Sequence, residues 1–455
     1  MEIIIKVAEV MLWVVGSLMF YGSFLAILGF LTPSKKFKKT EKKYTYCVVV
    51  AARNEEKIIA QVLHSIQKQD YPADKITTIV VAHNCTDKTA EIARAEGAIV
   101  YEYNNSKERT RGFALKHGFE RIKEEYGIYA FDGYVICDAD FVMEQNYFTE
   151  MNNAFDNKRY DVFVGYLNSK NVDMGLFPSW RGMCFYRVNC TGQRPRSMLG
   201  LNTRVNGPAP FIRNFILHDG YKWDSIADDS EIWAWITAKG YRSTYVESAK
   251  YYTENPKSLR MIARQEIRWS RANLVVFYRS FLLLLIGFFL PKDLSQRRKQ
   301  IPEKPKEKLH IKALIGTQKR LSCYDAFLSL LPGWVLHFIM GVIYPLGIII
   351  YGIITGNSIA VPLIQVVITY LLLCYYSLLQ NTLTLIREYK NVRCNRRIFL
   401  YIFIWPFVDI IFSFVSFIAL ILPTKWIHYP TQRHDTREIE EIKEIKNIYE
   451  VVAMK

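Results

Sequence analysis

The sequence predicts an α/β fold, an open twisted sheet of the Rossmann-like type, together with α-helical transmembrane segments. Two observations predict it. Strand-like and helix-like segments alternate along residues 44–275. Apolar blocks flank this region, and those at 3–31, 326–354, 359–386 and 398–422 each exceed the roughly 20 residues that a helix needs to cross a bilayer. We therefore expect a soluble domain of catalytic size inserted between membrane segments.

Five regions follow from this pattern. They are an N-terminal transmembrane helix with a basic linker (1–43), the soluble domain (44–275), an apolar segment with a basic loop (276–322), the C-terminal transmembrane helices (323–422) and a tail (423–455). No small-x-small cleavage site separates the first apolar block from its basic flank, so we expect a retained anchor rather than a signal peptide. Phe277–Leu290 is short, which favours a helix in the membrane interface, with a span as the alternative.

The positive charge of the chain follows the membrane segments. The net charge is +16, and its clusters flank the apolar blocks at Lys35–Lys43, Arg297–Lys308 and Arg387–Arg397. Basic flanks mark the cytosolic side of a membrane. We therefore expect a multi-pass protein of the cell membrane, in contact with the lipid bilayer, whose soluble domain lies in the cytosol. The same distribution argues against a nucleic-acid partner. Counting the membrane crossings places the tail outside the cell, whereas its basic residues favour the cytosol. The side of the membrane on which the tail lies is therefore left open.

Within the soluble domain, apolar and β-branched runs predict strands at 44–50, 76–81, 98–101 and 133–137. Helical periodicity predicts helices near 58–66, 88–96 and 111–126. Such alternation predicts a largely parallel sheet, and ligands of these sheets bind beyond the carboxyl ends of the strands. Polar groups lie at three of these ends: Arg53–Glu55, Asn84–Asp87 and Asp138–Asp140. We therefore expect a binding site along one rim of the sheet.

Asp138 and Asp140 come directly after the apolar run 133–137. Strand alternation places both side chains on one side, where two carboxylates repel each other unless a cation lies between them. Mg²⁺ or Mn²⁺ prefers such oxygen ligands together with diphosphate oxygens. The pair therefore predicts a site for a metal-bound diphosphate. The alternative is a turn with two solvated aspartates.

Asp228-Asp229 is a second acidic pair. A carboxylate can act as general base by taking the proton of an attacking hydroxyl group. A neighbouring carboxylate raises the pKa of such a base. The alternative interpretation is an acidic N-cap pair for a helix at 230–239.

Gln265, Arg268 and Trp269 are spaced i, i+3 and i+4, so a helix places them on one face. An arginine there can stabilise a departing diphosphate. A tryptophan offers a flat apolar surface for a sugar ring. The alternative is an amphipathic helix with a buried tryptophan.

Taken in order, Asp138-Ala139-Asp140, Asp228-Asp229 and Gln265-x-x-Arg268-Trp269 resemble the motifs of the processive branch of the family 2 inverting glycosyltransferases. This branch includes cellulose, hyaluronan, chitin and poly-N-acetylglucosamine synthases. The resemblance implies a catalytic domain of the GT-A type. The sequence departs from the family pattern at Ala227 and Asp228, which replace Thr and Glu, and at Asn84, where Asp is frequent.

The resemblance also implies a role for each motif residue. It implies that Arg53, Glu55 and Asp87 bind the nucleotide and that Arg111 contacts the diphosphate. It implies that Asp140 binds Mg²⁺ or Mn²⁺, with Asp138 contacting nucleotide and metal, and that Asp229 is the general base beside Asp228. It also implies that Gln265 and Arg268 stabilise the leaving group and that Trp269 holds the acceptor sugar. Weaker acceptor candidates are Gln193, Arg196, Ser197 and residues 206–208.

The implied function is that of a membrane-embedded, metal-dependent, inverting transferase. It would polymerise a cytosolic UDP-sugar into a β-linked extracellular polysaccharide, such as a capsule or exopolysaccharide, and help to export it. Its partners would be the UDP-sugar donor, the growing polysaccharide and the bilayer, with room for accessory subunits. The alternatives are a non-processive enzyme that glycosylates a lipid and a catalytically inactive scaffold subunit. The sequence names neither the sugar nor the linkage.

Overall fold

The computed structural model describes residues 20–205, 207, 209–290, 309–331, 343–356, 360–421 and 436–453. Residues 3–19 of the first predicted membrane block lie outside the described residues. The remainder of that block, Phe20–Leu31, forms a helix.

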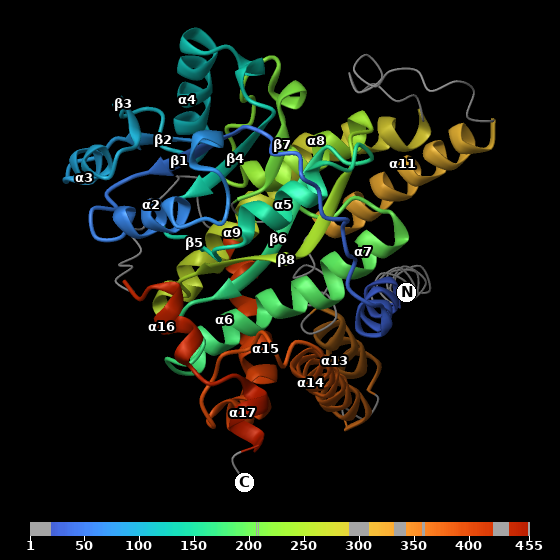
Figure 1. The fold of residues 1–455 in the computed structure, drawn as a ribbon. Coiled ribbons are helices and arrows are strands. Elements are labelled where there is room, and N and C mark those ends of the chain that lie inside the picture. Colours follow the sequence, from blue (N-terminus) through green and yellow to red (C-terminus); the bar gives the residue numbers. More distant parts are fainter. Residues whose placement is uncertain are drawn as a thin grey trace.

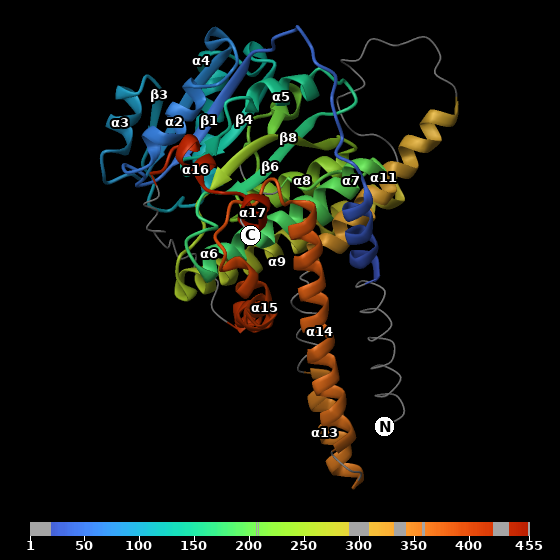
Figure 2. The ribbon, with the colours of Figure 1, turned by 60° about the horizontal axis from the view of Figure 1, so that its bottom comes forward.

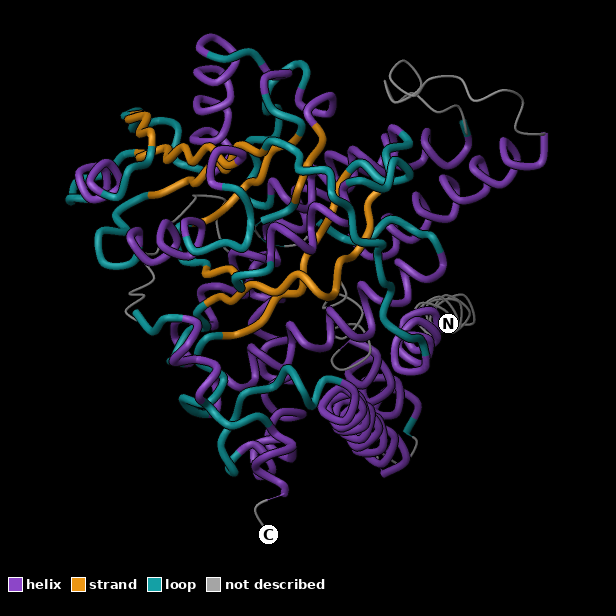
Figure 3. Tube along the Cα trace, in the orientation of Figure 1, coloured by secondary structure: helices purple, strands orange, loops and turns teal. Residues whose placement is uncertain are grey.

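In the described part of the chain, eight strands form one mixed sheet at the centre of the molecule (Figures 1 and 3). The strands are β1 (Tyr46–Ala52), β2 (Ile76–His83), β3 (Ile99–Tyr103), β4 (Gly133–Asp138), β5 (Val142–Met143), β6 (Val162–Ser169), β7 (Phe211–Arg213) and β8 (Ser243–Thr253), in the order β3-β2-β1-β4-β7-β6-β8-β5. The first four strands along the chain are parallel, as the alternation predicts, and β6 is parallel to β8. β7 runs antiparallel to β4 and β6, and β5 runs antiparallel to β8, so the sheet is mixed and not parallel throughout.

Helices cover both faces of the sheet (Figure 1). They are α2 (Ile59–Gln67), α3 (Thr89–Ala95), α4 (Arg111–Glu125), α5 (Tyr147–Phe155) and α8 (Asp228–Lys239), with short 3-10 turns at Ala73–Lys75, Ile128–Ala130 and Asn214–Leu217. Side chains alternate along β1: Cys47 and Val49 pack in one core with α4 and α8, whereas Tyr46, Val48 and Val50 pack in another with α2 and α5. Burial of this apolar surface on both faces stabilises the sheet. This packing also fixes the carboxyl ends of the strands, where the loops of the candidate site begin.

A second group of helices lies beside the sheet domain. They are α6 (Leu176–Arg187), a π-helical turn (Val188–Gln193), α7 (Arg194–Leu199), α9 (Leu259–Phe289), α11 (Leu309–Leu330), α13 (Tyr344–Thr355), α14 (Ala360–Arg387) and α15 (Ile398–Ile421). Figure 2 shows α13 and α14 projecting away from the sheet. Within the described residues, two helices are long and apolar enough to cross a membrane by length and composition, Leu259–Phe289 and Ile398–Ala419.

Helix α9 joins two segments that the sequence analysis treats separately. It is one continuous helix of 31 residues that contains both the Gln-x-x-Arg-Trp motif and the apolar segment after it. Its apolar end packs closely on α8 and α11, because a Cβ at Gly287 would lie 2.9 Å from Cys323 Sγ and 3.1 Å from Ala238 Cα. The expected domain boundary at residue 275 therefore falls inside one helix and not between two elements. The motif and the apolar segment form one rigid rod.

The C-terminal tail packs on the sheet domain. Its helices are α16 (Ile439–Glu444) and α17 (Ile448–Ala453). Lys68 Nζ lies 2.9 Å from Glu438 Oε2, and Arg437 Nη2 donates to the carbonyl oxygen of Lys170 at 2.8 Å. Ile442 is fully buried. The described part of the tail therefore packs against the sheet domain.

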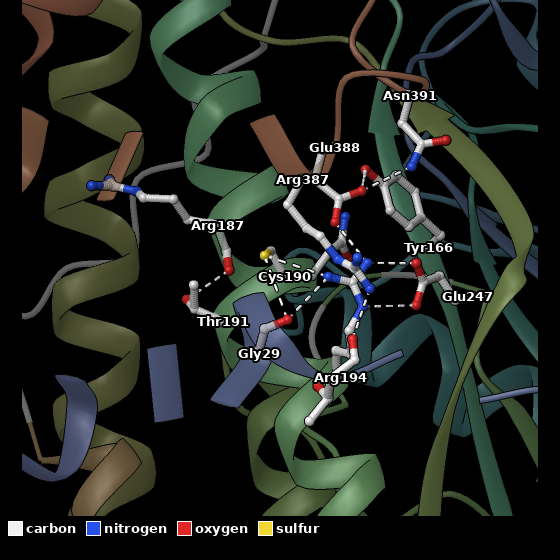
Figure 4. A network of polar contacts seen from close by, with 12 residues as sticks. Gly29, Tyr166, Arg187, Cys190, Thr191, Arg194, Glu247, Arg387, Glu388 and Asn391 are labelled. Carbon is white, nitrogen blue, oxygen red and sulfur yellow. Dashed lines mark hydrogen bonds and ion pairs between the residues drawn. The ribbon is translucent and has the colours of Figure 1, made fainter. Parts of the chain in front are cut away.

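A buried polar network fastens the second group of helices to the sheet (Figure 4). Arg194, at the start of α7, lies 2.7 Å from Glu388 and 2.5 Å from Glu247 through Nη2, and its Nη1 donates to the carbonyl oxygen of Gly29 at 3.4 Å. The Tyr166 hydroxyl donates to Glu388 at 2.9 Å. The network thus links the N-terminal helix, β6, β8 and the end of α14. Breaking one side of such a buried pair leaves an uncompensated charge, which is strongly destabilising.

Candidate active site

The loops after β1 and β2 are bound to each other at the carboxyl rim. Both contain an asparagine in the left-handed region, Asn54 at φ 56° and Asn84 at φ 52°, a conformation that asparagine tolerates better than most residues. Asn54 Oδ1 accepts a hydrogen bond from the backbone N–H of Thr86 at 2.8 Å. Asp87 Oδ2 accepts from the backbone N–H of Glu56 at 3.1 Å. The two loops therefore form one unit.

The predicted nucleotide residues meet on this unit. The Glu55 backbone N–H donates to Thr89 Oγ1 at 2.8 Å, and Asp87 Oδ1 accepts from the same hydroxyl at 2.6 Å. Asp87 Oδ1 also accepts from the backbone N–H of Thr89, the first residue of α3, at 3.1 Å. Arg53 lies at the same rim, where burial and the neighbouring Arg109 lower its pKa. The structure brings these three predicted residues together.

Arg111 connects two of the acidic motifs. It is the first residue of α4, forms an ion pair with Asp138 through Nε, and donates through Nη1 to both oxygens of Asp228 at 3.0 and 2.8 Å. The Tyr221 hydroxyl also donates to Asp228 at 2.5 Å. Burial alone would lower the pKa of Arg111, but Asp138 and Asp228 raise it well above its usual range. The guanidinium therefore stays charged at the position predicted for the diphosphate.

Asp138 and Asp140 occupy different environments. β4 ends at Asp138, and Asp140 lies in the turn beyond it, so strand alternation does not extend to the second carboxylate. Asp138 is half-buried against Arg111, whereas Asp140 is buried and accepts from Thr253 Oγ1 at 3.4 Å. The turn with two solvated aspartates, considered as an alternative above, is therefore not what forms.

The residues at this turn fit a magnesium or manganese ion that shares its coordination with a ligand. Among the described residues, no three His, Cys, Asp or Glu side chains gather in a metal-binding cluster. The chain thus offers two carboxylates here. Mg²⁺ is commonly bound through one or two carboxylates plus substrate phosphates and water, and Mn²⁺ suits the same oxygen donors.

Asp229 has the environment of a general base. Its Oδ2 accepts from the backbone N–H of Gly207 at 2.8 Å, and its Oδ1 from that of Ser230 at 2.7 Å. Burial and the neighbouring Asp228 raise the pKa of Asp229 to about 6. The helix cap at Ala227 makes no side-chain hydrogen bond, and Asp228 is committed to Arg111. The acidic N-cap interpretation therefore does not explain the pair.

Helix α9 begins after Ser258, whose Oγ accepts from the backbone N–H of Met261 at 3.3 Å. Gln265 is buried, and its Oε1 has no hydrogen-bond partner among the described residues. Arg268 interacts electrostatically with Asp138, which places it near the first acidic motif. The guanidinium carbon of Arg181 lies 4.8 Å from the ring centre of Trp269. The structure therefore brings the helix motif to the same rim as the acidic motifs.

Other residues differ from their expected roles. Gln193 exchanges hydrogen bonds with the backbone of Arg204, and Arg196 pairs with Asp325 of α11 at 2.8 Å. These contacts brace α7, and so do not favour acceptor binding by either residue. Ser197 Oγ lies 3.3 Å from Thr244 Oγ1. Residues 206 and 208 lie outside the described residues.

Sequence reasoning missed several neighbours of the site. Tyr221 and Thr253 contact the acidic motifs, and Arg181 contacts the helix motif. The hydroxyl of Tyr251 is buried with no hydrogen-bond partner among the described residues, and a Cβ at Gly207 would lie 3.5 Å from it. None of these residues stands in a recognisable motif, since only the fold brings them to the rim.

Comparison with known proteins gives consistent results. Residues 44–272 match the family described as "Glycosyltransferase like family 2". The probable glycosyltransferase YdaM of Bacillus subtilis is 24% identical over 296 residues, which cover 62% of this chain and 65% of YdaM. The 4,4'-diaponeurosporenoate glycosyltransferase of Staphylococcus haemolyticus is 30% identical over 126 residues, 27% of this chain and 29% of that protein. The chain therefore spans less than two thirds of the length of these curated relatives.

One solved structure shares most of the architecture. The mannosyltransferase PcManGT from Pyrobaculum calidifontis, solved in complex with GDP-Man and Mn²⁺, superposes with a TM-score of 0.56 at 16% identity. The match covers 89% of this chain and 98% of that one. It supports the predicted GT-A-like fold.

Proposed function

The chain belongs to glycosyltransferase family 2, and from this premise we propose that it transfers a sugar from a nucleotide-diphosphate donor to a hydroxyl group of a lipid acceptor at the membrane surface. The observation that carries the acceptor class is helix α9. One rod holds Gln265, Arg268 and Trp269 near its start and continues as an apolar helix long enough to enter a membrane. An acceptor with a lipid body and a polar head matches this continuity.

The donor would lie along the carboxyl rim. We assign Glu55 and Asp87, with Arg53, to the nucleotide, because carboxylates accept hydrogen bonds from base imide and ribose hydroxyl groups. We assign Arg111 and Arg268, which both interact with Asp138, to the diphosphate. We retain UDP as the proposed nucleotide, while the structural relative was solved with GDP-Man and Mn²⁺. Asp140 and Asp138 would hold the metal ion, which supplies positive charge to the diphosphate when bound.

In the proposed reaction the acceptor oxygen attacks the anomeric carbon of the sugar. A C–O bond forms to the acceptor as the bond to the diphosphate oxygen breaks on the opposite side, which inverts the anomeric configuration. The hydroxyl proton passes to a carboxylate oxygen of Asp229. The electron pair leaves with the nucleoside diphosphate, whose charge Arg268 and Arg111 stabilise. Asp228 keeps Arg111 in place beside the base.

Two observations support a lipid over a polymer as acceptor. By length and composition, the described helices that could enter a membrane are α9 and α15. Helix α9 contains Gln265, Arg268 and Trp269, and α15 contacts Trp180 through Phe412. The staphylococcal relative is named as a 4,4'-diaponeurosporenoate glycosyltransferase. The polysaccharide synthase predicted from the motif order remains the second candidate, since Trp269 is the motif residue expected to hold a growing sugar chain.

Product size separates the two candidates. We would reconstitute the full chain in proteoliposomes, supply UDP- and GDP-sugars with Mn²⁺ or Mg²⁺ and a membrane lipid extract, and measure nucleotide release. If mass spectrometry detects a lipid with one added sugar for the wild type and not for Asp229→Asn, the proposal is supported. A high-mass polymer would support the synthase. Donor binding without turnover, unchanged by Asp229→Asn, would favour the scaffold alternative.

A further inference from the structure

The side chain of Arg181 is enclosed between two tryptophans. It belongs to α6, is only 4% exposed, and forms an ion pair with Glu266 of α9. Its guanidinium carbon lies 4.8 Å from the ring centre of Trp180 and 4.8 Å from that of Trp269. A guanidinium within about 6 Å of an aromatic ring centre is attracted to it, and more strongly when water is excluded. Arg181 therefore holds α6 and the motif helix together at the indole of Trp269.

Trp180 is in turn fixed by helix α15. Its Nε1 donates to Asp409 Oδ1 at 2.8 Å, and its ring stacks on Phe412 at 4.6 Å between centres. The Ser377 hydroxyl of α14 donates to Asp409 at 2.6 Å. Asp409 lies within an apolar helix long enough to cross a membrane. Polar side chains in such segments are costly unless they are satisfied by partners, and Asp409 has them.

We propose that Arg181 is a positioning residue for the acceptor: stacked between Trp180 and Trp269 and paired with Glu266, it fixes the Trp269 indole and couples it to the apolar helix α15 through Asp409. The inference rests on the proposed function, because it names a residue that sets acceptor affinity at the same site. Arg181 itself need not touch the donor. Its loss should therefore weaken acceptor binding while leaving donor binding intact.

The arrangement also explains why arginine is needed. Lysine at position 181 could retain a charge contact with Glu266. It lacks the planar group that can face two indole rings at once. Arg181→Lys thus removes the stacking and keeps the charge, whereas Arg181→Gln removes both.

Arg121 of α4 provides a matched control. It also pairs with a carboxylate, Glu125, and lies 5.6 Å from the ring centre of Tyr101, but its side chain is 46% exposed. Both of these contacts lie outside α9. Arg121→Lys should therefore leave both substrates' binding unchanged.

The test measures acceptor KM, donor KM and kcat for the full chain in nanodiscs, with the lipid acceptor found for the wild type. We expect Arg181→Lys to raise acceptor KM by about tenfold, Arg181→Gln to raise it further, and donor KM to stay within about twofold. Equal changes in both KM values, or none, would overturn the proposal. Loss of kcat with both KM values unchanged would also overturn it.

A second readout does not depend on turnover. Acrylamide quenching of tryptophan fluorescence, compared between each variant and the same variant with Trp269→Phe, reports the exposure of that indole. We expect greater quenching of Trp269 in Arg181→Lys than in wild type. Unchanged quenching would overturn the positioning role. If the wild type uses no lipid acceptor while Trp269 still becomes more exposed in the variant, the proposed function fails and the positioning of Trp269 by Arg181 stands.

Discussion

At the scale of single residues, the pKa of Asp229 links chemistry to pH. Burial and Asp228 raise it to about 6, above the usual value for an aspartate. The carboxylate must be ionised to accept a proton, so transfer should be lost as pH falls through about 6. We expect kcat/KM to decrease tenfold per pH unit below that value. Rates measured from pH 4.5 to 8 check this, with wild-type donor binding at each pH as control. A rate independent of pH between 5 and 7 would contradict it.

The same pKa makes a prediction about stability. A carboxyl group whose pKa is raised by folding adds no penalty at low pH, where it is protonated in both states. The penalty grows as pH rises from about 4 to about 6, and is then complete. Asp229→Asn should therefore raise the thermal unfolding temperature at pH 7.5 and lose that gain toward pH 4. An equal shift at both pH values would show that the effect has another cause.

The side chain of Arg111 forms ion pairs with both acidic motifs, through Asp138 and Asp228. Replacing it with methionine leaves Asp138 and Asp228 close together without their common cation. Breaking a buried pair on one side costs roughly 3–5 kcal/mol, and this site is partly exposed, so we expect less. Arg111→Met should lower the unfolding temperature and weaken UDP binding measured by calorimetry. Arg111→Lys, which keeps the charge, should recover part of both losses.

The residue scale is also where sequence reasoning is least complete. Asp138, Asp228 and Arg111 are each recognisable from local patterns, but their mutual ion pairs are not, because residues 111 and 228 are distant in sequence. Arg181 has no pattern of its own. Contacts between side chains of different elements depend on how the elements pack. A motif in the sequence carries no information about that packing.

At the scale of elements, Gly112 sets how closely α4 approaches the loop before α8. A Cβ there would lie 2.3 Å from the carbonyl oxygen of Trp223 and 2.7 Å from Asp224 Cα, both backbone atoms. Gly112→Ala must therefore push α4 away and carry Arg111 with it. We expect a large loss of transfer rate and weaker UDP binding. Gly97→Ala provides a control for backbone strain, since it has φ +80° and no atom within 4 Å. Similar losses in both variants would contradict this explanation.

Helix α9 supports another prediction at this scale. Proline at the exposed residue Val275 would break the rod between Trp269 and the apolar end, at a cost of about 3 kcal/mol or more. Val275→Pro should retain UDP binding and lose transfer to the lipid acceptor, whereas Val275→Ala should behave as wild type. Transfer by the proline variant at the wild-type rate would show that continuity of the helix is unnecessary.

The sequence predicts which segments are helices or strands better than it predicts which elements lie next to each other. The first strands and their polar ends are confirmed near the expected residues, because alternation and strand-end chemistry are local. The insertion of β7 between β4 and β6 depends on long-range pairing that no local pattern encodes. The continuity of α9 escaped prediction because its amphipathic and apolar parts have different compositions, although nothing between them ends a helix.

At the scale of the whole molecule, the sheet domain and the tail share one side. Glu438 and Arg437 contact α2 and Lys170, and Ile442 is fully buried. If α15 crosses a membrane once, the end of α14 cannot lie on that same side. Yet Arg194 binds Glu388, just after α14, within the sheet-side network. Both ends of α15 are therefore tied to the sheet domain, which favours a helix that enters the membrane surface without crossing it.

Cysteine labelling in intact cells tests this arrangement. We would introduce Lys57→Cys in the sheet domain, Lys443→Cys in the tail and Arg396→Cys before α15, and treat cells with a membrane-impermeant maleimide. All three positions are exposed. We expect each to be labelled only after permeabilisation, with wild type measuring the background from native thiols. Labelling of Lys443→Cys alone in intact cells would mean that α15 crosses the bilayer once and that the tail does not pack on the sheet domain in the cell.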